Sequence, residues 1–213
     1  MFVRELLHDL LDLIAPRCCP GCDVWLDKRV PFCPACWPLL ERISVDSSHL
    51  KSATAAFVYG GPLADGICKL KYQGRTDLTS SLGSLWVHAL APYRDQIDMV
   101  VPVPLYPKRL RLRGFNQSAL LAAYVANHLK VPLSTNSVWR VRDTLPQVDL
   151  DASKRITNVQ GAFKAKLSSS GQRVLVIDDV KTTGATMAEA ARALCNVGAE
   201  RVYCLALAQS ELD

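Results

Sequence analysis

One segment near the end of the sequence constrains the fold more than any other. Residues 174–177 (VLVI) are an unbroken run of apolar residues with high strand propensity, as in a strand buried on both faces of a parallel sheet. Asp178 and Asp179 follow directly, and a short turn rich in threonine and glycine then opens a helical pattern. Because open α/β sheets bind ligands at the carboxyl ends of their strands, this segment predicts both an α/β fold and a ligand site at that edge.

The residue types of this turn fit a sugar phosphate. Backbone N–H groups of the turn and of the helix start can cradle a phosphate dianion, and the helix dipole favours its charge. Glycine lets the backbone approach the anion, and hydroxyl groups add donors. Two adjacent acids repel a phosphate, so we expect them to accept hydrogen bonds from the hydroxyls of a ribose. The predicted ligand-binding residues are Asp178, Asp179, Lys181, Thr182, Thr183, Gly184, Ala185 and Thr186.

The rest of the chain favours the same fold class. Strand-like runs at 55–59, 99–103 and 202–208 alternate with helical patterns at 63–70, 78–90, 118–129 and 185–195, which indicates a mostly parallel sheet flanked by helices. The 213 residues suffice for one substantial domain and a small appendage, and a net charge of +5 does not by itself indicate a nucleic-acid binder. Residues 142–162 are polar and aperiodic, so we expect a long loop that acts as a flexible lid.

Two C-x-x-C pairs lie near the N-terminus, at 19–22 and 33–36. Together they can supply the four thiolates of a tetrahedral zinc site, in a hairpin-sized spacing that resembles a zinc ribbon. Redox-active C-x-x-C is less favoured, because neither pair lies at a strand-to-helix start. Cys18 leaves the register open, although the tight Pro-Gly turn favours Cys19. A site closed by four thiolates has no open position, so we expect structural Zn²⁺ bound by Cys19, Cys22, Cys33 and Cys36.

Residues 1–14 have an amphipathic helical pattern. Charged residues interrupt any signal-peptide-like run, no cleavage site follows, and no apolar run approaches the ~18 residues of a membrane span. We expect this helix to pack against the protein, with weak contact to a membrane surface as the alternative. The sequence therefore favours a cytoplasmic protein whose eight cysteines are reduced.

A cluster of cations follows the predicted strand at 99–103. Lys108, Arg109, Arg111 and Arg113 lie within six residues, in what we expect to be a loop at the carboxyl end of that strand. Guanidinium and ammonium groups there can bind pyrophosphate. The alternative for any one of them is a solvated basic surface.

The segment 174–186 closely resembles the phosphoribosyl-pyrophosphate (PRPP) signature of type I phosphoribosyltransferases. Further runs resemble the ComF/GntX family: LKYQG at 70–74, VPVP at 101–104, KRLRLRGFNQ at 108–117 and scattered residues between 142 and 163, together with the cysteine pairs. The resemblance covers nearly the whole chain. It implies a helix at 1–14, a zinc-ribbon element at 15–44 and a type I phosphoribosyltransferase-like domain at 45–213.

The resemblance also implies ligands and roles. PRPP, or ribose 5-phosphate, would bind with Mg²⁺ held mainly by phosphate oxygens. Pyrophosphate departure would involve Lys108, Arg109 and Arg113, and a lid over 142–158 would close through Gln147 and Arg155. Arg113 and Arg155 are the implied catalytic residues. The implied biological role is DNA uptake in natural transformation, with single-stranded DNA and other competence proteins as partners.

Three functions stay open at this point. The favoured one is a PRPP-binding protein that handles incoming single-stranded DNA. The second is a metabolic phosphoribosyltransferase acting on a small nucleophile, and the third is a nucleic-acid-binding zinc ribbon with a relic PRPP loop. Trp25, Trp37, Tyr72 and Phe115 are candidate platforms for stacked bases, although such aromatics are more often core or turn residues. The sequence identifies neither the acceptor nor the oligomeric state.

Overall fold

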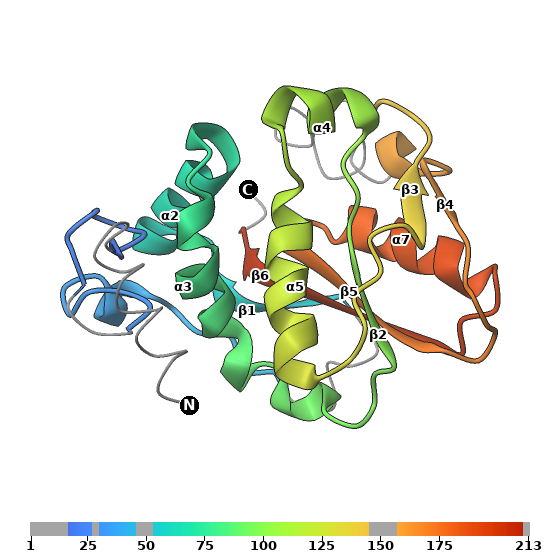
Figure 1. Cartoon of the computed structure of the whole chain (residues 1–213), viewed down its shortest axis with the longest axis horizontal. Coiled ribbons are helices and arrows are strands. Elements are labelled where there is room, and N and C mark those ends of the chain that lie inside the picture. The colour runs from blue at the N-terminus through green and yellow to red at the C-terminus, as the bar shows by residue number, and fades with distance from the viewer. Residues whose placement is uncertain (1–16, 27–29, 46–52, 145–156, 211–213) are drawn as a thin grey trace, which may run out of the picture.

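A computed structural model describes residues 17–26, 30–45, 53–144 and 157–210. Within these residues the centre is a four-stranded sheet in the order β1-β6-β5-β2, with every pair parallel (Figure 1). The α/β class and all four predicted strands are therefore confirmed. The strands are β1 (Thr54–Val58), β2 (Met99–Pro102), β5 (Arg173–Lys181) and β6 (Arg201–Gln209).

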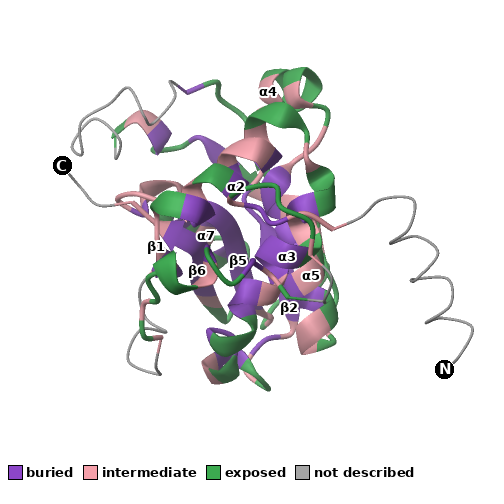
Figure 2. Cartoon of the chain, turned by 90° about the vertical axis from the view of Figure 1, so that its left-hand side faces the viewer, coloured by how far each residue is buried: buried purple, intermediate pink, exposed green. Residues whose placement is uncertain are grey.

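Helices cover both faces of this sheet, in two separate cores. Leu175 and Ile177 of β5 belong to a buried cluster with residues of α2, α3 and α5, whereas Val174 and Val176 belong to a second cluster with residues of α7. Alternate side chains of one strand thus enter different layers, as the apolar run predicts. Figure 2 shows β5 and β6 buried along most of their length. The covering helices are α2 (Gly61–Gln73), α3 (Thr79–Ser84), α5 (Gln117–Leu129) and α7 (Ala185–Cys195).

The bounds of β5 differ from the prediction in a way that matters for the site. The strand continues beyond Ile177 to Lys181 and pairs with β6 as far as Gln209. Asp178 and Asp179 therefore lie inside the strand rather than directly after its last residue. Their backbones are fixed by the ladder, and both side chains are buried.

Two predicted segments have a different conformation. Residues 78–90 form no single helix but a chain of short ones: η3 (Thr76–Leu78), α3 and η4 (Leu85–His88), with η5 (Ala91–Tyr93) after them. Serine, threonine and Gly83 dominate α3, and their low helix propensity accounts for the break. The cationic stretch expected as a loop is a helix, α4 (Pro107–Arg113), which begins at a proline and ends at Gly114 with φ of 82°.

The cysteine element packs on the same core as the sheet. Cys19, Phe32, Cys33 and Cys36 belong to the buried cluster that α2, α3 and α5 share. The fit to α2 is close, because a Cβ on Gly66 would lie 2.7 Å from the Cβ of Pro20. A short helix, η1 (Trp37–Leu39), follows the second cysteine pair. The predicted helix at 1–14 lies outside the described residues.

A small antiparallel hairpin, β3 (Val138–Arg140) and β4 (Phe163–Ala165), joins the second core beside α7. The segment between these two strands contains the predicted lid, of which residues 145–156 lie outside the described part. Among the helices that the structure describes, none has the length and apolar character needed to cross a membrane.

Candidate functional site

The predicted acid pair lies where β5 meets the ends of two helices. Asp178 is 8% exposed and Asp179 is 3% exposed. Asp178 accepts hydrogen bonds from the Ser118 hydroxyl at 2.8 Å and from the backbone N–H of Asp179 at 3.0 Å. Asp179 accepts one from the Gln117 amide at 3.4 Å and forms an ion pair with Lys71 at 2.5 Å. The first turn of α5 and the last turn of α2 therefore complete the acid site.

Burial controls the protonation of these groups. Burial, and then the negative charge of Asp179, raise the pKa of Asp178 to about 8. Burial acts in the same direction on Asp179, but the attraction of Lys71 outweighs it, and the pKa of Asp179 is lowered. Burial disfavours the charged form of Lys71, yet the two carboxyls raise the pKa of this lysine. Near neutral pH the cluster thus holds a protonated Asp178, a carboxylate on Asp179 and one ammonium.

The predicted phosphate turn follows the acids and opens α7. Gly184 has φ of 79°, a left-handed conformation that favours glycine, and precedes the first residue of the helix. The Thr183 hydroxyl accepts a hydrogen bond from the backbone N–H of Ala185 at 3.3 Å. Lys181 donates to the Gln209 side chain at 2.8 Å. A cavity of about 640 Å³ opens against this turn and is lined by four of the predicted residues, Lys181, Thr183, Gly184 and Ala185.

Two further predicted residues border the same turn. Thr182 directly follows the end of β5, and Thr186 lies in the first turn of α7. The amino end of this 11-residue helix thus faces the region of the hydroxyl-rich turn. N–H groups and a helix dipole at that position suit an anion such as phosphate.

The predicted pyrophosphate cations divide into two groups on α4. Arg109 and Arg113 line a second cavity of about 350 Å³ together with Lys71 and Tyr72, whereas Lys108 is not among its lining residues. The Arg113 guanidinium lies 5.5 Å from the centroid of the Tyr72 ring. Arg113 also donates to the side-chain oxygen of Gln117, the residue that contacts Asp179. This cavity is therefore adjacent to the acid pair through Lys71 and Gln117.

The stem of the predicted lid is tied to α7. The Arg142 guanidinium donates to the backbone carbonyls of Gln160 at 2.5 Å and Asn158 at 3.1 Å, across the two sides of the segment. The backbone N–H of Gly161 donates to the Glu189 carboxylate at 2.6 Å. These contacts fix where the lid segment leaves and re-enters the domain.

Two guanidinium groups meet at the start of the lid segment. Arg109 donates to the Thr144 carbonyl at 2.6 Å, and Arg140 donates to the Thr144 hydroxyl. Arg140 is 8% exposed, and its Nε has no hydrogen-bond partner among the described residues. Burial, and then the positive charge of Arg109, lower the pKa of Arg140 to about 10. The predicted lid contacts Gln147 and Arg155 lie outside the described residues.

Several residues of the site could not be predicted from sequence periodicity. Lys71, Gln117 and Ser118 lie on helices, and nothing in their periodicity distinguishes them from solvent-facing positions. Lys71 and Gln117 do lie in the runs that resemble the ComF family, and this resemblance is the signal that points to them. Arg140 has no such signal, because its burial depends on Phe163, whose ring centroid lies 5.3 Å from the guanidinium.

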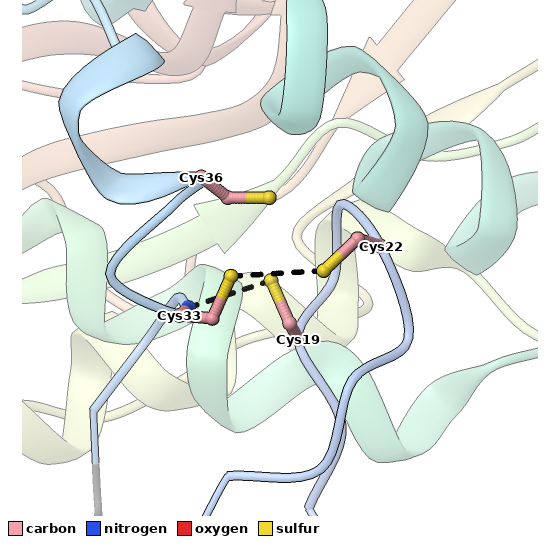
Figure 3. Close-up of side chains that lie close together, drawn as sticks. All are labelled: Cys19, Cys22, Cys33 and Cys36. Atoms are coloured by element: carbon pink, nitrogen blue, oxygen red, sulfur yellow. Dashed lines mark hydrogen bonds between the residues drawn. The ribbon is translucent and has the colours of Figure 1, made fainter.

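The four predicted cysteine ligands converge on one point (Figure 3). The sulfurs of Cys19, Cys22, Cys33 and Cys36 all lie within 4.8 Å of one another, and those of Cys22 and Cys33 are 3.6 Å apart. A tetrahedral ion with Zn–S bonds of about 2.3 Å would place its sulfurs roughly 3.8 Å apart, so the arrangement fits one metal ion. Cys18 is not a member of this group. The group contains Cys19, as expected from the Pro-Gly turn, and the assignment of Cys19 as a metal ligand stays a prediction.

One cysteine of the cluster has a lowered thiol pKa. The backbone hydrogen bond at Cys36 is the main cause that brings the pKa of Cys33 to about 7, against the opposing effect of burial. Burial raises the pKa of the Cys36 thiol instead. A thiolate is the form that binds metal, and a lowered pKa favours this form of Cys33.

Charged residues fasten the first cysteine pair to α2. Lys69 donates to the Gly21 carbonyl at 3.0 Å and pairs with the Asp23 carboxylate at 2.5 Å. Arg75 pairs with Asp23 at 3.0 Å, from just beyond the carboxyl end of the helix. Lys71 lies two residues from Lys69 and reaches the acid pair instead. One helix thus contacts both the cysteine cluster and the acid site.

Comparison with known proteins identifies the family. A family model described as a phosphoribosyl transferase domain matches residues 116–211. The chain is 31% identical over 201 residues to the DNA utilization protein YhgH of Salmonella typhimurium, with 88% of each chain covered. It is 30% identical over 207 residues to competence protein F of Haemophilus influenzae, with 90% of each chain covered. The chain belongs to the ComF/YhgH family.

The predicted membership of the ComF family is thereby confirmed, and so is the phosphoribosyltransferase-like α/β fold with its four-cysteine cluster. Among solved structures, adenine phosphoribosyl transferase from Trypanosoma brucei matches with 12% identity and a TM-score of 0.40, over 65% of this chain and 66% of that one. In this ComF/YhgH protein the matched domain begins at Asn116, the N-cap of α5. Lys71 and the four cysteines therefore lie outside the matched stretch.

Proposed function

We propose that this ComF/YhgH protein binds PRPP at the carboxyl edge of β5 and uses that site in the uptake of DNA. The proposal depends on one observation: a buried acid pair lies next to a turn that suits an anion. Asp178 and Asp179 lie near the carboxyl end of β5, and Thr183 and Gly184 lie between this strand and α7. Acids suit ribose hydroxyls, and the turn suits the 5-phosphate.

The charges of the site support a ligand with two anionic ends. The turn beside the cavity of about 640 Å³ can take the 5-phosphate, while Arg109 and Arg113 at the cavity of about 350 Å³ can take the pyrophosphate. PRPP carries both groups on one ribose, which would lie between them at the acid pair. Mg²⁺ would arrive with the ligand, because it is held mainly by phosphate oxygens and supplies charge neutralisation there. Ribose 5-phosphate would use the turn and the acid pair, but not the cations of the smaller cavity.

The proposed catalytic assignments follow the same layout. Arg113 would hold pyrophosphate as it departs, and Arg155 would approach it from the lid. Lys108 would contribute through long-range attraction, since it does not line the cavity. Exclusion of water by the lid would protect a reactive sugar from hydrolysis.

The metal of the cysteine cluster is proposed to be Zn²⁺ in a structural role. Four thiolates are soft ligands and leave no open coordination position for chemistry. All eight cysteines are free, which fits a reducing compartment, and we place the protein in the cytoplasm. Its domain organisation is proposed to be a terminal helix at 1–14, the cysteine element at 15–44 and the ligand-binding domain at 45–213, with residues 1–14 as a candidate membrane-surface contact.

The biological role is inferred from relatives. Their names refer to DNA utilization in Salmonella typhimurium and to competence in Haemophilus influenzae and Bacillus subtilis. We infer that this protein handles incoming single-stranded DNA, together with other competence proteins. A metabolic phosphoribosyltransferase is the second candidate, and a relic PRPP site is the third.

Isothermal titration tests the ligand. PRPP with Mg²⁺ is expected to bind the parent protein, and Thr183→Ala should weaken it by about 1–2 kcal/mol, the loss of one hydrogen bond to a charged group. Asp178→Ala should weaken PRPP while leaving inorganic phosphate nearly unchanged, with folding checked by thermal melting. Equal loss of both ligands would show that the acids are misassigned, and absence of PRPP binding to the parent would refute the proposal.

A transformable host tests the role. The host's own family member is replaced by this chain, and transformation is scored beside growth on minimal medium. Thr183→Val removes the hydroxyl while keeping the shape of the side chain, and it spares the buried Asp179, whose loss would leave Lys71 without its partner. Failed transformation with normal growth is expected. Parental transformation by Thr183→Val would indicate a relic site, and a nutrient requirement would favour the metabolic enzyme.

A further inference from the structure

The cavity beside α4 has features that pyrophosphate does not require. Its cations are Lys71, Arg109 and Arg113, but it is also lined by Tyr72 and Leu112. Tyr72 is 72% exposed and Leu112 is 81% exposed. A small polyanion gains nothing from apolar surface, so this lining indicates a ligand that carries a flat apolar group next to its phosphate.

The exposed tyrosine is held ready for such a group. The Arg113 guanidinium lies 5.5 Å from the centroid of its ring, which restrains the ring by a cation–π contact. At 72% exposure, most of the ring still faces solvent. An oriented, exposed aromatic beside cations is how proteins bind the bases of single-stranded nucleic acids.

The charge of the cavity matches a terminal phosphate. Lys71 is neutralised by Asp179, whereas Arg109 and Arg113 donate hydrogen bonds to the neutral oxygens of Thr144 and Gln117. No carboxylate is among the lining residues that the structure describes. Two positive charges therefore remain, equal to the charge of about −2 on a phosphate monoester near pH 7. An internal phosphodiester carries only one.

The volume of the cavity suits one nucleotide. About 350 Å³ is at the lower end of the range of roughly 300–1,000 Å³ that small-molecule sites occupy. The remainder of a longer strand would leave past the rim at Leu112.

We propose that this cavity is a subsite for the 5′-terminal nucleotide of single-stranded DNA. Arg109 and Arg113 bind the 5′-phosphate, and the terminal base stacks on Tyr72. The proposal rests on the DNA-handling role proposed above, but it does not depend on PRPP binding. Of the four aromatic residues singled out in the sequence, Tyr72 and Phe115 line this cavity. Trp25 and Trp37 lie on the cysteine element and do not line it.

Fluorescence anisotropy with a 15-nucleotide oligothymidylate, labelled at its 3′ end, tests the subsite. The strand with a 5′-phosphate should bind at least about tenfold more tightly than the same strand with a 5′-hydroxyl, the scale of one charge-assisted contact. Tyr72→Ala should weaken binding of the phosphorylated strand by about tenfold, within the range for loss of one stacked base. Tyr72→Phe, which keeps the aromatic ring, should bind this strand like the parent. The blunt duplex of the same length should bind less tightly at equal salt.

The matched control is Trp25→Ala, since Trp25 is also 72% exposed but lies on the cysteine element. It should bind the phosphorylated strand like the parent. The subsite is overturned if the parent binds neither strand, or binds both strands with equal affinity. It is also overturned if Tyr72→Ala keeps the parent's affinity for the phosphorylated strand, or if Trp25→Ala loses as much affinity as Tyr72→Ala. Failure of PRPP to bind the parent would instead overturn only the ribose-phosphate proposal.

Discussion

Two lysines on α2 make a sharp test of how burial sets the strength of an ion pair. Lys69 pairs with Asp23, and Lys71 pairs with Asp179, each with a nitrogen–oxygen distance of 2.5 Å. The side chains of the two lysines are similarly exposed, at 13% and 18%. Their partners differ, because the Asp23 side chain is 46% exposed and the Asp179 side chain only 4%. Replacing each lysine by methionine removes the charge and keeps much of the volume.

The two expected costs differ. Removing one partner of a buried ion pair costs about 3–5 kcal/mol because the other charge is left buried, and the partial exposure of Lys71 places Lys71→Met near 3 kcal/mol. An exposed pair contributes about 0–1 kcal/mol and the hydrogen bond from Lys69 to the Gly21 carbonyl about 1 kcal/mol, so Lys69→Met should cost about 1–2 kcal/mol. For a chain of this size each kcal/mol corresponds to about 2–4 °C in the melting temperature. Lys71→Met should therefore melt about 6–12 °C below the parent at pH 7.

The pH dependence gives a second signature. In the parent, the lowered pKa of Asp179 stabilises the folded state above the unfolded pKa of about 3.9, and this contribution is lost as pH falls. Without Lys71, burial raises the pKa of Asp179, so the folded variant binds more protons than the unfolded chain and loses stability as pH rises. The stability gap between parent and Lys71→Met should thus widen from pH 4 to pH 7. The gap for Lys69→Met should change far less.

Thermal melts followed by circular dichroism at pH 5 and pH 7 measure both effects. Adding Asp179→Asn to Lys71→Met should recover part of the lost stability, because it removes the unpaired charge. The reasoning fails if the two lysine variants melt within 2 °C of each other at pH 7, or if the Lys71→Met gap is the same at both pH values.

Two other predictions follow from the packing of the cysteine element and of α3. Cys33→Ser should lose the bound metal and Cys18→Ser should keep it, which metal analysis of protein purified without chelator will decide; retention of metal by Cys33→Ser would contradict the four-sulfur site. Gly83→Ala would place a Cβ 2.6 Å from the Tyr124 ring and should cost about 1–3 kcal/mol in urea unfolding. Gly60→Ala, where no atom lies within 4 Å of the added Cβ, should cost much less free energy of unfolding. If Gly83→Ala costs no more than Gly60→Ala, the Tyr124 ring moves aside without penalty and the reasoning is wrong.

Much of this architecture was accessible from local sequence. The apolar run at 174–177 predicts a strand buried on both faces, and its alternate residues do enter two different cores. The two C-x-x-C pairs predict one four-sulfur cluster, because each pair brings its thiols together by a tight turn and the hairpin needs only to fold back once. In both cases the information lies within a few neighbouring residues.

Other features depended on contacts that no local pattern encodes. The end of β5 lies beyond the acids because β6 pairs with it as far as Lys181, and a partner strand decides where a ladder stops. The cations at 108–113 were expected on a loop because they follow a strand, yet a proline start and a glycine stop suffice for a short helix over Pro107–Arg113. Lys71 is a site residue only because α2 ends beside β5, a tertiary relation between segments far apart in sequence.

The position of Lys71 bears on where the functional unit of this protein begins. The matched phosphoribosyl transferase domain starts at residue 116 and contains both acids, but the ammonium group that balances Asp179 comes from residue 71. The helix that carries Lys71 is in turn fastened to the first cysteine pair by Lys69 and by the close fit of Gly66 against Pro20. A fragment restricted to residues 116–211 would leave a buried carboxylate unpaired and one face of the sheet covered by α5 alone, because α2 and α3 supply the rest of the helices in that core. The cysteine cluster and the phosphoribosyltransferase-like domain therefore depend on each other through α2.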